Sequence, residues 1–252
     1  MANREELATL TAEAEKRIRP HVLLTPLLPS RVLSDLVGAE VFLKMESEQV
    51  SGSFKLRGAT NKILLTQGRQ ELVTASTGNH AIATATALAK LGLRGTIVLP
   101  ETTVAEKKET LGLFSNVDLE FCGTDCIEAE TRARKLATET GRIYVSPYND
   151  VDIMTGQGTI AVEILQQLPA VDAIFVTVGG GGLAGGIAAY IKSRRPECVV
   201  IGCQPVNSAV MSESVKAGKI LDLESLDTLS DGSSGSLLLL SSPPLPSPLN
   251  FS

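Results

Sequence analysis

Short apolar runs alternate with longer stretches that are apolar along one side through most of the chain. The runs predict strands over 39–46, 71–76, 94–100, 117–123, 142–147, 171–182 and 198–205. The longer stretches predict helices over 3–18, 53–66, 78–92, 104–114, 125–141, 155–169 and 183–196. Strands that are apolar nearly throughout are typical of parallel sheets with helices on both faces, so the pattern predicts an α/β fold. Ligands of such folds bind beyond the carboxyl ends of the strands.

The last segment departs from this pattern. From Ser230 the chain reads SDGSSGSLLLLSSPPLPSPLNFS, with no charge after Asp231 and no strand or helix periodicity. Its prolines disfavour regular structure, so we expect residues 231–252 to form an irregular low-complexity tail without a packed element.

Composition excludes several classes of function. The net charge is −5, only 4% of the residues are aromatic and none is Trp, so nucleic acid is not an expected partner. The amino terminus has no signal-peptide core, and the apolar run 237–240 is far shorter than the about 20 residues of a membrane helix. We therefore expect no membrane contact and a cytoplasmic location.

Cysteine and histidine give no sign of a metal site. The four cysteines, at positions 122, 126, 198 and 203, form no CxxC pair, and we interpret them as reduced, mostly buried thiols. The two histidines, His21 and His80, lie far apart in the sequence, so a zinc site built on histidine is not expected. No residue is assigned to a metal.

Lys55 lies in the stretch SGSFKLRGA, residues 51–59. The small residues before it would let another molecule come close. A lysine that does covalent chemistry must be neutral part of the time, and apolar surroundings favour this by lowering its pKa. The alternative is an ordinary surface lysine at the start of a helix.

A second motif, STGNHA at 76–81, lies between a predicted strand and a predicted helix. Unpaired backbone N–H groups at a helix start bind anions, including carboxylates. The Ser and Thr hydroxyls and the Asn amide add further donors. The alternative is an ordinary helix cap with a satisfied polar histidine.

A third motif, VGGGGLAGG at 178–186, follows an apolar strand. Four successive glycines leave backbone N–H groups free to surround a phosphate, and the following helix adds its dipole. Gly180-x-Gly182-x-x-Gly185 also matches a dinucleotide fingerprint, which needs an acidic residue after the next strand. That strand ends instead in Gln204-Pro205, so we do not expect NAD or FAD.

These three motifs, together with TGQGTIAVEI at 155–164, resemble the fold-type II pyridoxal-phosphate enzymes, and most of all their serine/threonine dehydratase (ammonia-lyase) and serine racemase branch. The resemblance runs from about residue 15 to about residue 235. It implies pyridoxal 5′-phosphate as the cofactor and a tryptophan synthase β-like fold of two open, mostly parallel sheets. Within that fold we predict a small domain at 72–147 and a large cofactor-binding domain built from 1–71 and 148–230.

The resemblance implies a role for each motif. Lys55 would be the Schiff-base lysine, Phe54 would pack beside the cofactor ring, and Asn79 would bind the cofactor's phenolic oxygen. The phosphate would be held by Gly179, Gly180, Gly181 and Gly182. The loop that binds the substrate carboxylate would consist of Ser76, Thr77, Gly78, Asn79 and His80.

By the same resemblance, the reaction is β-elimination of L-serine or L-threonine to a 2-keto acid and ammonia, with Lys55 removing the Cα proton. The alternative is a serine or aspartate racemase, which needs a proton donor on the opposite face. In the racemases that donor is a serine of the carboxylate loop, and Thr77 takes its position here with a bulkier hydroxyl that favours elimination. Serine, threonine and 3-hydroxyaspartate all stay open as substrates, and a homodimer is expected.

The likeness fades at TLSDGSSG, residues 228–235. The family's large domain continues beyond this point and supplies a late Ser, Thr or Cys to the pyridine nitrogen, for which no counterpart is identifiable here. The position matched to an acidic metal ligand is Gln204. We therefore interpret the chain as C-terminally truncated, which leaves an inactive homologue as a further alternative.

Overall fold

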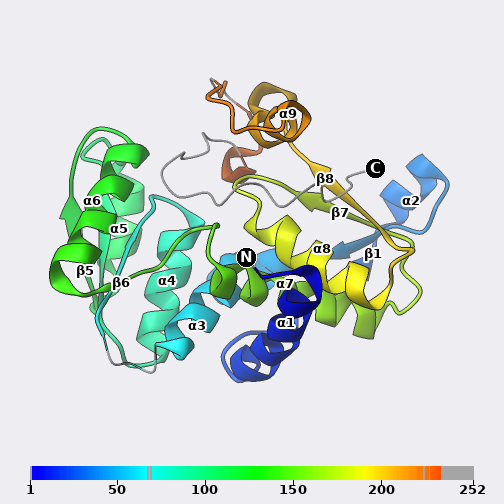
Figure 1. Cartoon of the computed structure of the whole chain (residues 1–252), viewed down its shortest axis with the longest axis horizontal. Helices are drawn as coiled ribbons and strands as arrows, with labels where there is room; N and C mark the ends of the chain where they lie inside the picture. The colour runs from blue at the N-terminus through cyan, green and yellow to red at the C-terminus, as the bar shows by residue number, and fades with distance from the viewer. Residues whose placement is uncertain (1, 67, 69, 224, 227, 234–252) are drawn as a thin grey trace.

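The computed structural model describes residues 2–66, 68, 70–223, 225, 226 and 228–233. Figure 1 shows helices α4, α5 and α6 around a sheet at one end of the molecule, and α7, α8, β7 and β8 toward the other. The predicted α/β fold is confirmed. No described helix combines the length and the apolar character needed to cross a bilayer.

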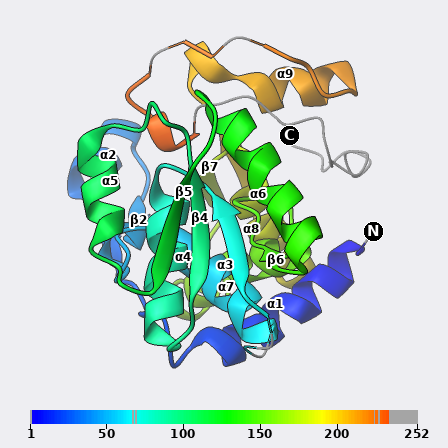
Figure 2. The same ribbon diagram turned by 90° about the vertical axis from the view of Figure 1, so that its left-hand side faces the viewer.

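A four-stranded parallel sheet has the strand order β5-β4-β3-β6. Its strands are β3 (Leu72–Ala75), β4 (Gly95–Leu99), β5 (Val117–Phe121) and β6 (Ile143–Tyr144). The helices around it are α4 (Asn79–Lys90), α5 (Ala105–Gly112) and α6 (Cys126–Thr140). Alternate side chains of a strand point to opposite faces. In β3, Val73 and Ala75 pack with α6, and Leu72 packs with α4. Both faces are therefore covered, as Figure 2 shows.

A second region is built around the helix α7 (Val151–Gln167), which is buried along most of its length. The helices α1 (Arg4–Ile18), α3 (Lys55–Leu65) and α8 (Gly182–Arg194) all pack against it. The parallel strands β7 (Ala173–Thr177) and β8 (Val199–Cys203) lie beside α8.

The β7–β8 sheet differs from the expectation of helices on both faces. Ile174 and Val176 are buried in the core that includes α8, whereas Phe175, which points the other way, is 70% exposed. In the part of the chain that the structure describes, helices therefore cover only one face of this pair of strands.

Glycines allow α3 and α7 to approach closely. A Cβ atom on Gly156 would lie 2.6 Å from the Cα of Gly58 and 2.8 Å from the carbonyl oxygen of Arg57. The amide of Gly58 donates a 3.1 Å hydrogen bond to Oε1 of Gln157, which joins the two helices at the same point. The helix that begins at Lys55 is thus fixed against the centre of the fold.

Most predicted elements are confirmed, with shifted ends. The helix predicted at 155–169 begins earlier, at Val151, because the carboxylate of Asp150 caps it by accepting hydrogen bonds from the amides of Asp152 and Ile153. The strand predicted at 39–46 shrinks to β2 (Phe42–Lys44).

The sequence analysis missed several short elements. These are β1 (Leu27–Pro29), which pairs antiparallel with β2, the helices α2 (Arg31–Val37) and α9 (Val210–Ala217), and the 3-10 turns Glu46–Glu48, Val206–Ser208 and Asp231–Ser233. The four-stranded sheet lies inside the predicted small domain, and the domain division itself stays a prediction. Residues 234–252 of the predicted tail lie outside the described residues.

We expect Gly156→Ala to lower the free energy of unfolding by about 1–3 kcal/mol, because its methyl group would overlap the backbone of α3. The matched control is Gly112→Ala in α5, where a Cβ would meet nothing within 4 Å. That change should be neutral or stabilise by about 0.5–1 kcal/mol. Urea unfolding followed by circular dichroism measures both, and equal effects of the two substitutions would contradict the close helix contact.

Candidate active site

Lys55 is the first residue of α3. Its Nζ donates a 2.7 Å hydrogen bond to the carbonyl oxygen of Pro147 and lies 5.4 Å from the centroid of the Phe54 ring. Burial lowers the pKa of Lys55 from 10.5 to about 8. With this pKa about a tenth of the molecules carry the neutral amine at pH 7, which is the form that covalent chemistry requires.

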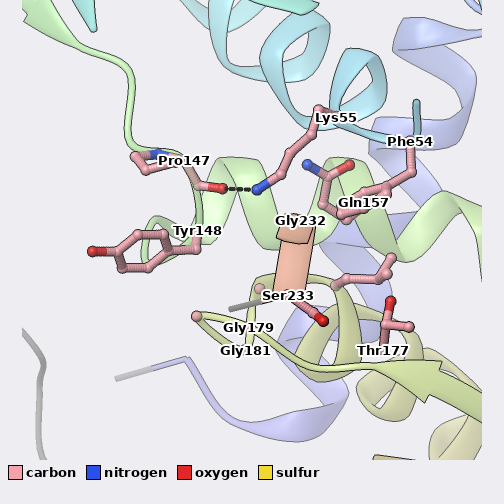
Figure 3. Close-up of a pocket in the computed structure, with 13 residues that line it drawn as sticks. Phe54, Lys55, Pro147, Tyr148, Gln157, Thr177, Gly179, Gly181, Gly232 and Ser233 are labelled. Carbon is pink, nitrogen blue, oxygen red and sulfur yellow. Dashed lines mark hydrogen bonds between the residues drawn. The ribbon is translucent and has the colours of Figure 1, made fainter. Parts of the chain in front are cut away.

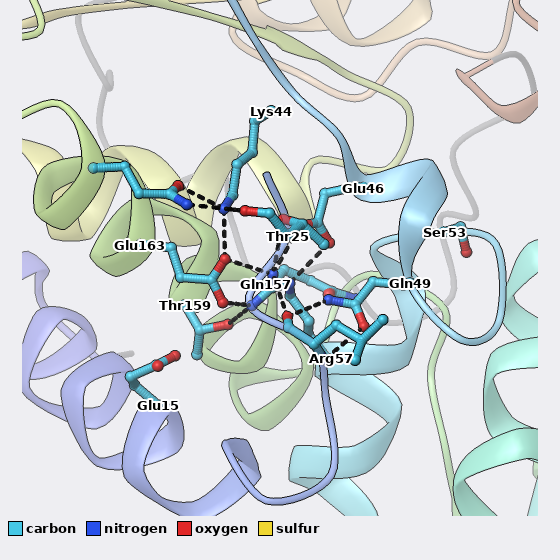
Figure 4. A network of polar contacts seen from close by, with 12 residues as sticks. Glu15, Thr25, Lys44, Glu46, Gln49, Ser53, Arg57, Gln157, Thr159 and Glu163 are labelled. Carbon is cyan, nitrogen blue, oxygen red and sulfur yellow. Dashed lines mark hydrogen bonds and ion pairs between the residues drawn. The ribbon is translucent and has the colours of Figure 1, made fainter. Parts of the chain in front are cut away.

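Arg57, two residues further along α3, lies in a quite different environment (Figure 4). Its guanidinium is fully buried and forms ion pairs with Glu46 and Glu163, each at 2.7 Å. Burial alone would lower the pKa of Arg57, but hydrogen bonds to these two carboxylates outweigh it and raise that pKa. Arg57 is therefore a permanent cation held between carboxylates.

Glu163, on α7, is the centre of this network. Its buried carboxylate also accepts a hydrogen bond from Lys44 at 2.6 Å and one from Arg19. Burial would raise the pKa of Glu163, but Arg57, Lys44 and Arg19 hold it at about 2. The network links α1, β2 and α3 to α7 through ion pairs with Glu163. These contacts fix the position of the start of α3, where Lys55 lies.

The four glycines connect the end of β7 to α8. The helix begins at Gly182, and its N-cap residue Gly181 has a φ of 84°, in the left-handed region that favours glycine. The first amides of α8 have no partner within the helix and point toward its N-terminal end, where an anion is favoured.

Lys55, Phe54 and the glycines line one cavity (Figure 3). Its complete lining is Phe54, Lys55, Pro147, Tyr148, Gln157, Thr177, Gly179, Gly180, Gly181, Gly182, Leu183, Gly232 and Ser233. The structure therefore brings together two of the three predicted motifs, from segments more than a hundred residues apart in the sequence.

The third motif, residues 76–80, lies at the junction of β3 and α4 and is not part of that lining. Gly78 is the N-cap of α4 but makes no side-chain capping bond, and its amide donates to Oγ of Ser76 at 3.2 Å. Thr77 is half-buried and Asn79 is exposed. An ordinary side-chain cap is thus excluded for this loop.

His80 is the buried member of this loop. Its buried Nε2 lies 3.1 Å from Oγ1 of Thr74 and 3.2 Å from the carbonyl oxygen of Val145. Burial, and then the positive charge of Lys55, lower the pKa of His80 to about 3. The imidazole is therefore neutral and joins β3 to the chain after β6, so it brings no positive charge to a carboxylate.

The sequence analysis assigned no site role to seven residues of the cavity lining. Two of them flank the glycine loop, Thr177 at the end of β7 and Leu183 in α8. Pro147 and Tyr148 follow β6, Gln157 lies on α7, and Gly232 and Ser233 belong to the short turn Asp231–Ser233. The stretch TGQGTIAVEI contained a signal for Gln157, because a polar residue between glycines in a buried helix needs a partner. Nothing in the Ser-rich composition around Gly232 indicated that this turn would contact the glycine loop.

Three comparisons relate the chain to known proteins. The family model described as pyridoxal-phosphate dependent enzyme matches residues 18–250. The L-threonine ammonia-lyase of Thermotoga maritima is 42% identical over 224 residues, which are 87% of this chain and 55% of that protein. The serine racemase of Oryza sativa subsp. indica is 35% identical over 87% of this chain and 66% of its own length.

Solved structures agree with these sequence matches. The processed form of threonine deaminase isoform 2 from Solanum lycopersicum superposes with a TM-score of 0.86 and 33% identity, over 94% of this chain and 70% of that chain. The chain thus spans about half to two-thirds of the length of the two curated relatives, and 70% of the solved one.

We expect Glu163→Gln to lower the free energy of unfolding at pH 7 by about 3–5 kcal/mol, because it leaves three cations without their shared carboxylate. The pKa of Glu163 is depressed from 4.5 to about 2 in the folded state, so this carboxylate stabilises the fold above about pH 4.5 and loses that contribution as the pH falls toward 2. The variant should therefore lose less stability than the wild type over that range.

The control for this prediction is Asp118→Asn, which breaks the exposed pair with Arg94 and should cost less than about 1 kcal/mol. Urea unfolding at a series of pH values measures the stability of all three proteins. A stability curve for Glu163→Gln that runs parallel to the wild-type curve below pH 5 would show that Glu163 is not the titrating group.

Proposed function

The chain belongs to the pyridoxal-phosphate dependent enzyme family, and from this premise we propose that it catalyses β-elimination of L-serine or L-threonine to a 2-keto acid and ammonia. The observation that carries the proposal is the shared cavity. A lysine whose pKa is about 8 and a loop of four glycines at a helix start line the same space. These are the two groups that a cofactor with an aldehyde and a phosphate requires.

The residues present fit such a cofactor chemically. Two buried polar atoms in the predicted motifs, Oγ of Ser53 and Nδ1 of His80, have no hydrogen-bond partner among the described residues, although neither residue lines the cavity. The cavity volume is about 50 Å³, well below the about 300 Å³ at which small-molecule sites begin. Because Gly232 and Ser233 form part of its wall, the turn Asp231–Ser233 has to shift outward to admit a whole cofactor.

When bound, the cofactor supplies an electron sink for the bond that breaks at the substrate's Cα. We propose that Lys55 would hold the cofactor covalently and that its free amine would accept the substrate's Cα proton at Nζ. The Pro147 carbonyl orients that nitrogen. The amides of Gly179–Gly182 would bind its phosphate, Phe54 would pack beside its ring, and Asn79 would bind its phenolic oxygen. The backbone of residues 76–80 binds the substrate carboxylate.

Elimination is proposed over racemisation because of Thr77. A racemase needs a proton donor on the face opposite Lys55, and the threonine hydroxyl at this position is more hindered than a serine hydroxyl. The relatives include both kinds of enzyme by name, a threonine ammonia-lyase and a serine racemase, so the choice rests on this residue.

A homodimer and a cytoplasmic location complete the proposal. The helix α2 supports a contact between subunits, because it buries none of its residues and exposes Val32, Leu36 and Val37 by 78%, 78% and 60%. Exposed apolar side chains on one short helix are typical of an interaction surface.

The covalent role of Lys55 is tested with cofactor and borohydride. Wild-type protein should form a reducible adduct whose mass and tryptic position identify Lys55, with a rate that rises with pH and is half-maximal near pH 8. Lys55→Ala should abolish the adduct. The exposed Lys107→Ala serves as the control and should behave like wild type. An undiminished adduct in Lys55→Ala would refute the assignment.

The reaction is tested by product analysis. We expect the protein to convert L-serine to keto acid at least about tenfold faster than to D-serine. Coupled lactate dehydrogenase measures the keto acid, and chiral chromatography of the residual serine measures D-serine. Thr77→Ser should move this ratio toward D-serine, because the smaller hydroxyl approaches the opposite face more easily. Racemisation that equals or exceeds elimination in the wild-type protein would favour the racemase instead.

A further inference from the structure

The turn between β8 and α9 contains Gln204, at the position that the family resemblance matches to an acidic metal ligand. The two polar atoms of its side chain meet different backbone groups. Oε1 accepts a 2.7 Å hydrogen bond from the amide of Ser212, and Nε2 donates a 3.4 Å hydrogen bond to the carbonyl oxygen of Ser208. The half-buried side chain therefore crosses the turn and closes it on both sides.

These two contacts require an amide side chain. A backbone amide can only donate and a carbonyl oxygen can only accept, so one side chain has to offer both an acceptor and a donor. Glutamine does so, whereas an ionised glutamate has two acceptors. Its second oxygen would face the carbonyl oxygen of Ser208, and the two repel each other unless a cation or a proton lies between them. The backbone of the turn therefore selects glutamine where no cation is bound.

The bond to Ser212 also caps α9. The first amides of a helix have no partner within the helix. The N-cap residue of α9 is Ala209, which makes no side-chain capping bond. Gln204 supplies the acceptor from the end of β8. Without it, the first turn of α9 would lose this partner.

The turn offers little else to a metal ion. Mg²⁺ and Ca²⁺ prefer several oxygen ligands with carboxylates among them. Glu213 is the one acidic residue between positions 204 and 213, and it pairs with Lys216 at 2.7 Å. No group of three or more histidine, cysteine, aspartate or glutamate side chains suited to a metal occurs in the described part of the chain. The residues present therefore do not fit the metal site that the resemblance implies.

Both ends of this turn contact the region of the glycine loop. The carbonyl oxygen of Cys203 accepts a 2.8 Å hydrogen bond from the amide of Val178, the residue before the four glycines. At the other end, Met211 packs against the core of β7 and α8, and its Cε would lie 3.2 Å from a Cβ on Gly181. An opened turn would therefore remove support from the loop.

We propose that the Gln204 amide takes the place of a divalent cation in this turn, so that the turn and the glycine loop beside it keep their arrangement without metal. The Nε2–H group meets the carbonyl oxygen of Ser208, which a cation shared with a carboxylate at position 204 would otherwise contact. This inference goes beyond the proposed reaction and does not depend on it.

The test uses the whole chain as wild type, as Gln204→Glu and as Gln204→Ala. Gln166→Glu is the matched control, because Gln166 is exposed on α7. Hydrogen exchange of the peptides spanning 203–213 and 178–184 is measured in excess EDTA, in millimolar Mg²⁺ and in millimolar Ca²⁺. A peptide of α3 spanning 56–64 monitors the global fold.

In the wild type, exchange of 203–213 and 178–184 should agree within about twofold in all three solutions. In EDTA, both substitutions of Gln204 should speed exchange of 203–213 by about tenfold, because its hydrogen bonds are lost. Either cation should return Gln204→Glu to within about twofold of the wild type, since a carboxylate and a carbonyl together attract it. The cations should not affect Gln204→Ala, and Gln166→Glu should match the wild type.

Slower exchange of the wild-type turn on addition of either cation would overturn the proposal, because a metal would then hold the turn. Wild-type exchange of Gln204→Glu in EDTA would also overturn it, because the amide would not be needed. So would failure of both cations to slow exchange in Gln204→Glu. A variant that unfolds as a whole, marked by faster exchange of 56–64, is compared instead by its melting temperature, which the cations should raise for Gln204→Glu alone.

Discussion

The structure depends above all on the ion pair between Arg57 and Glu163, which lies fully buried between α3 and α7. An unpaired charge at this depth would be prohibitive, so the two side chains specify the register of the two helices as well as joining them. Glu46, Lys44 and Arg19 complete the network, and Glu15 accepts a hydrogen bond from Arg19. Three cations and three carboxylates balance one another, and β2, α1, α3 and α7 all contribute to them.

This network explains how one short helix can hold two basic side chains whose pKa values are shifted in opposite directions. Arg57 and Lys55 are two residues apart, and burial disfavours the charge on both. Arg57 faces carboxylates and stays charged. Lys55 has only a backbone carbonyl and an aromatic ring near its nitrogen, and within the described chain no carboxylate pairs with it, so its pKa falls. Side chains two residues apart point to opposite sides of a helix, so Lys55 and Arg57 meet different partners, and those partners account for their different pKa shifts.

The sequence predicted what depends on local pattern. The strands of the four-stranded sheet, the long helices and the glycine loop all followed from apolar runs, from periodicity and from the residues at their ends. Glycine and lysine positions in the cavity were predicted through the family resemblance. The start of α7 could also have been found, because Asp150 is a typical capping residue and directly precedes Val151, where the helix begins. The predicted start at Thr155 is about one turn too late.

What the sequence did not reveal depends on contacts between distant segments. The partners of Arg57 lie at positions 46 and 163, both outside α3, so no periodicity within one helix or strand could indicate them. The short helix α2 was missed because its 7 residues are fewer than the window of about 11–18 residues in which helical periodicity is recognised, although Val32, Leu36 and Val37 give it an exposed apolar side. The turn at Gly232 and Ser233 lies in a stretch of low-complexity composition, and only the folded chain brings it to the glycine loop.

The glycine loop shows why a motif and its surroundings have to be considered together. From the sequence, four glycines indicate a loop whose backbone amides bind an anion. The conformation of such a loop accounts for Gly181, because its φ of 84° lies in the left-handed region that favours glycine. It does not account for Gly180 and Gly182, where the close neighbour is Tyr148. Two constraints therefore act on one loop, and the second comes from a residue that carries no motif. A side chain introduced at Gly180 would overlap Tyr148. Displacing Tyr148 would in turn displace Pro147, whose carbonyl orients Lys55.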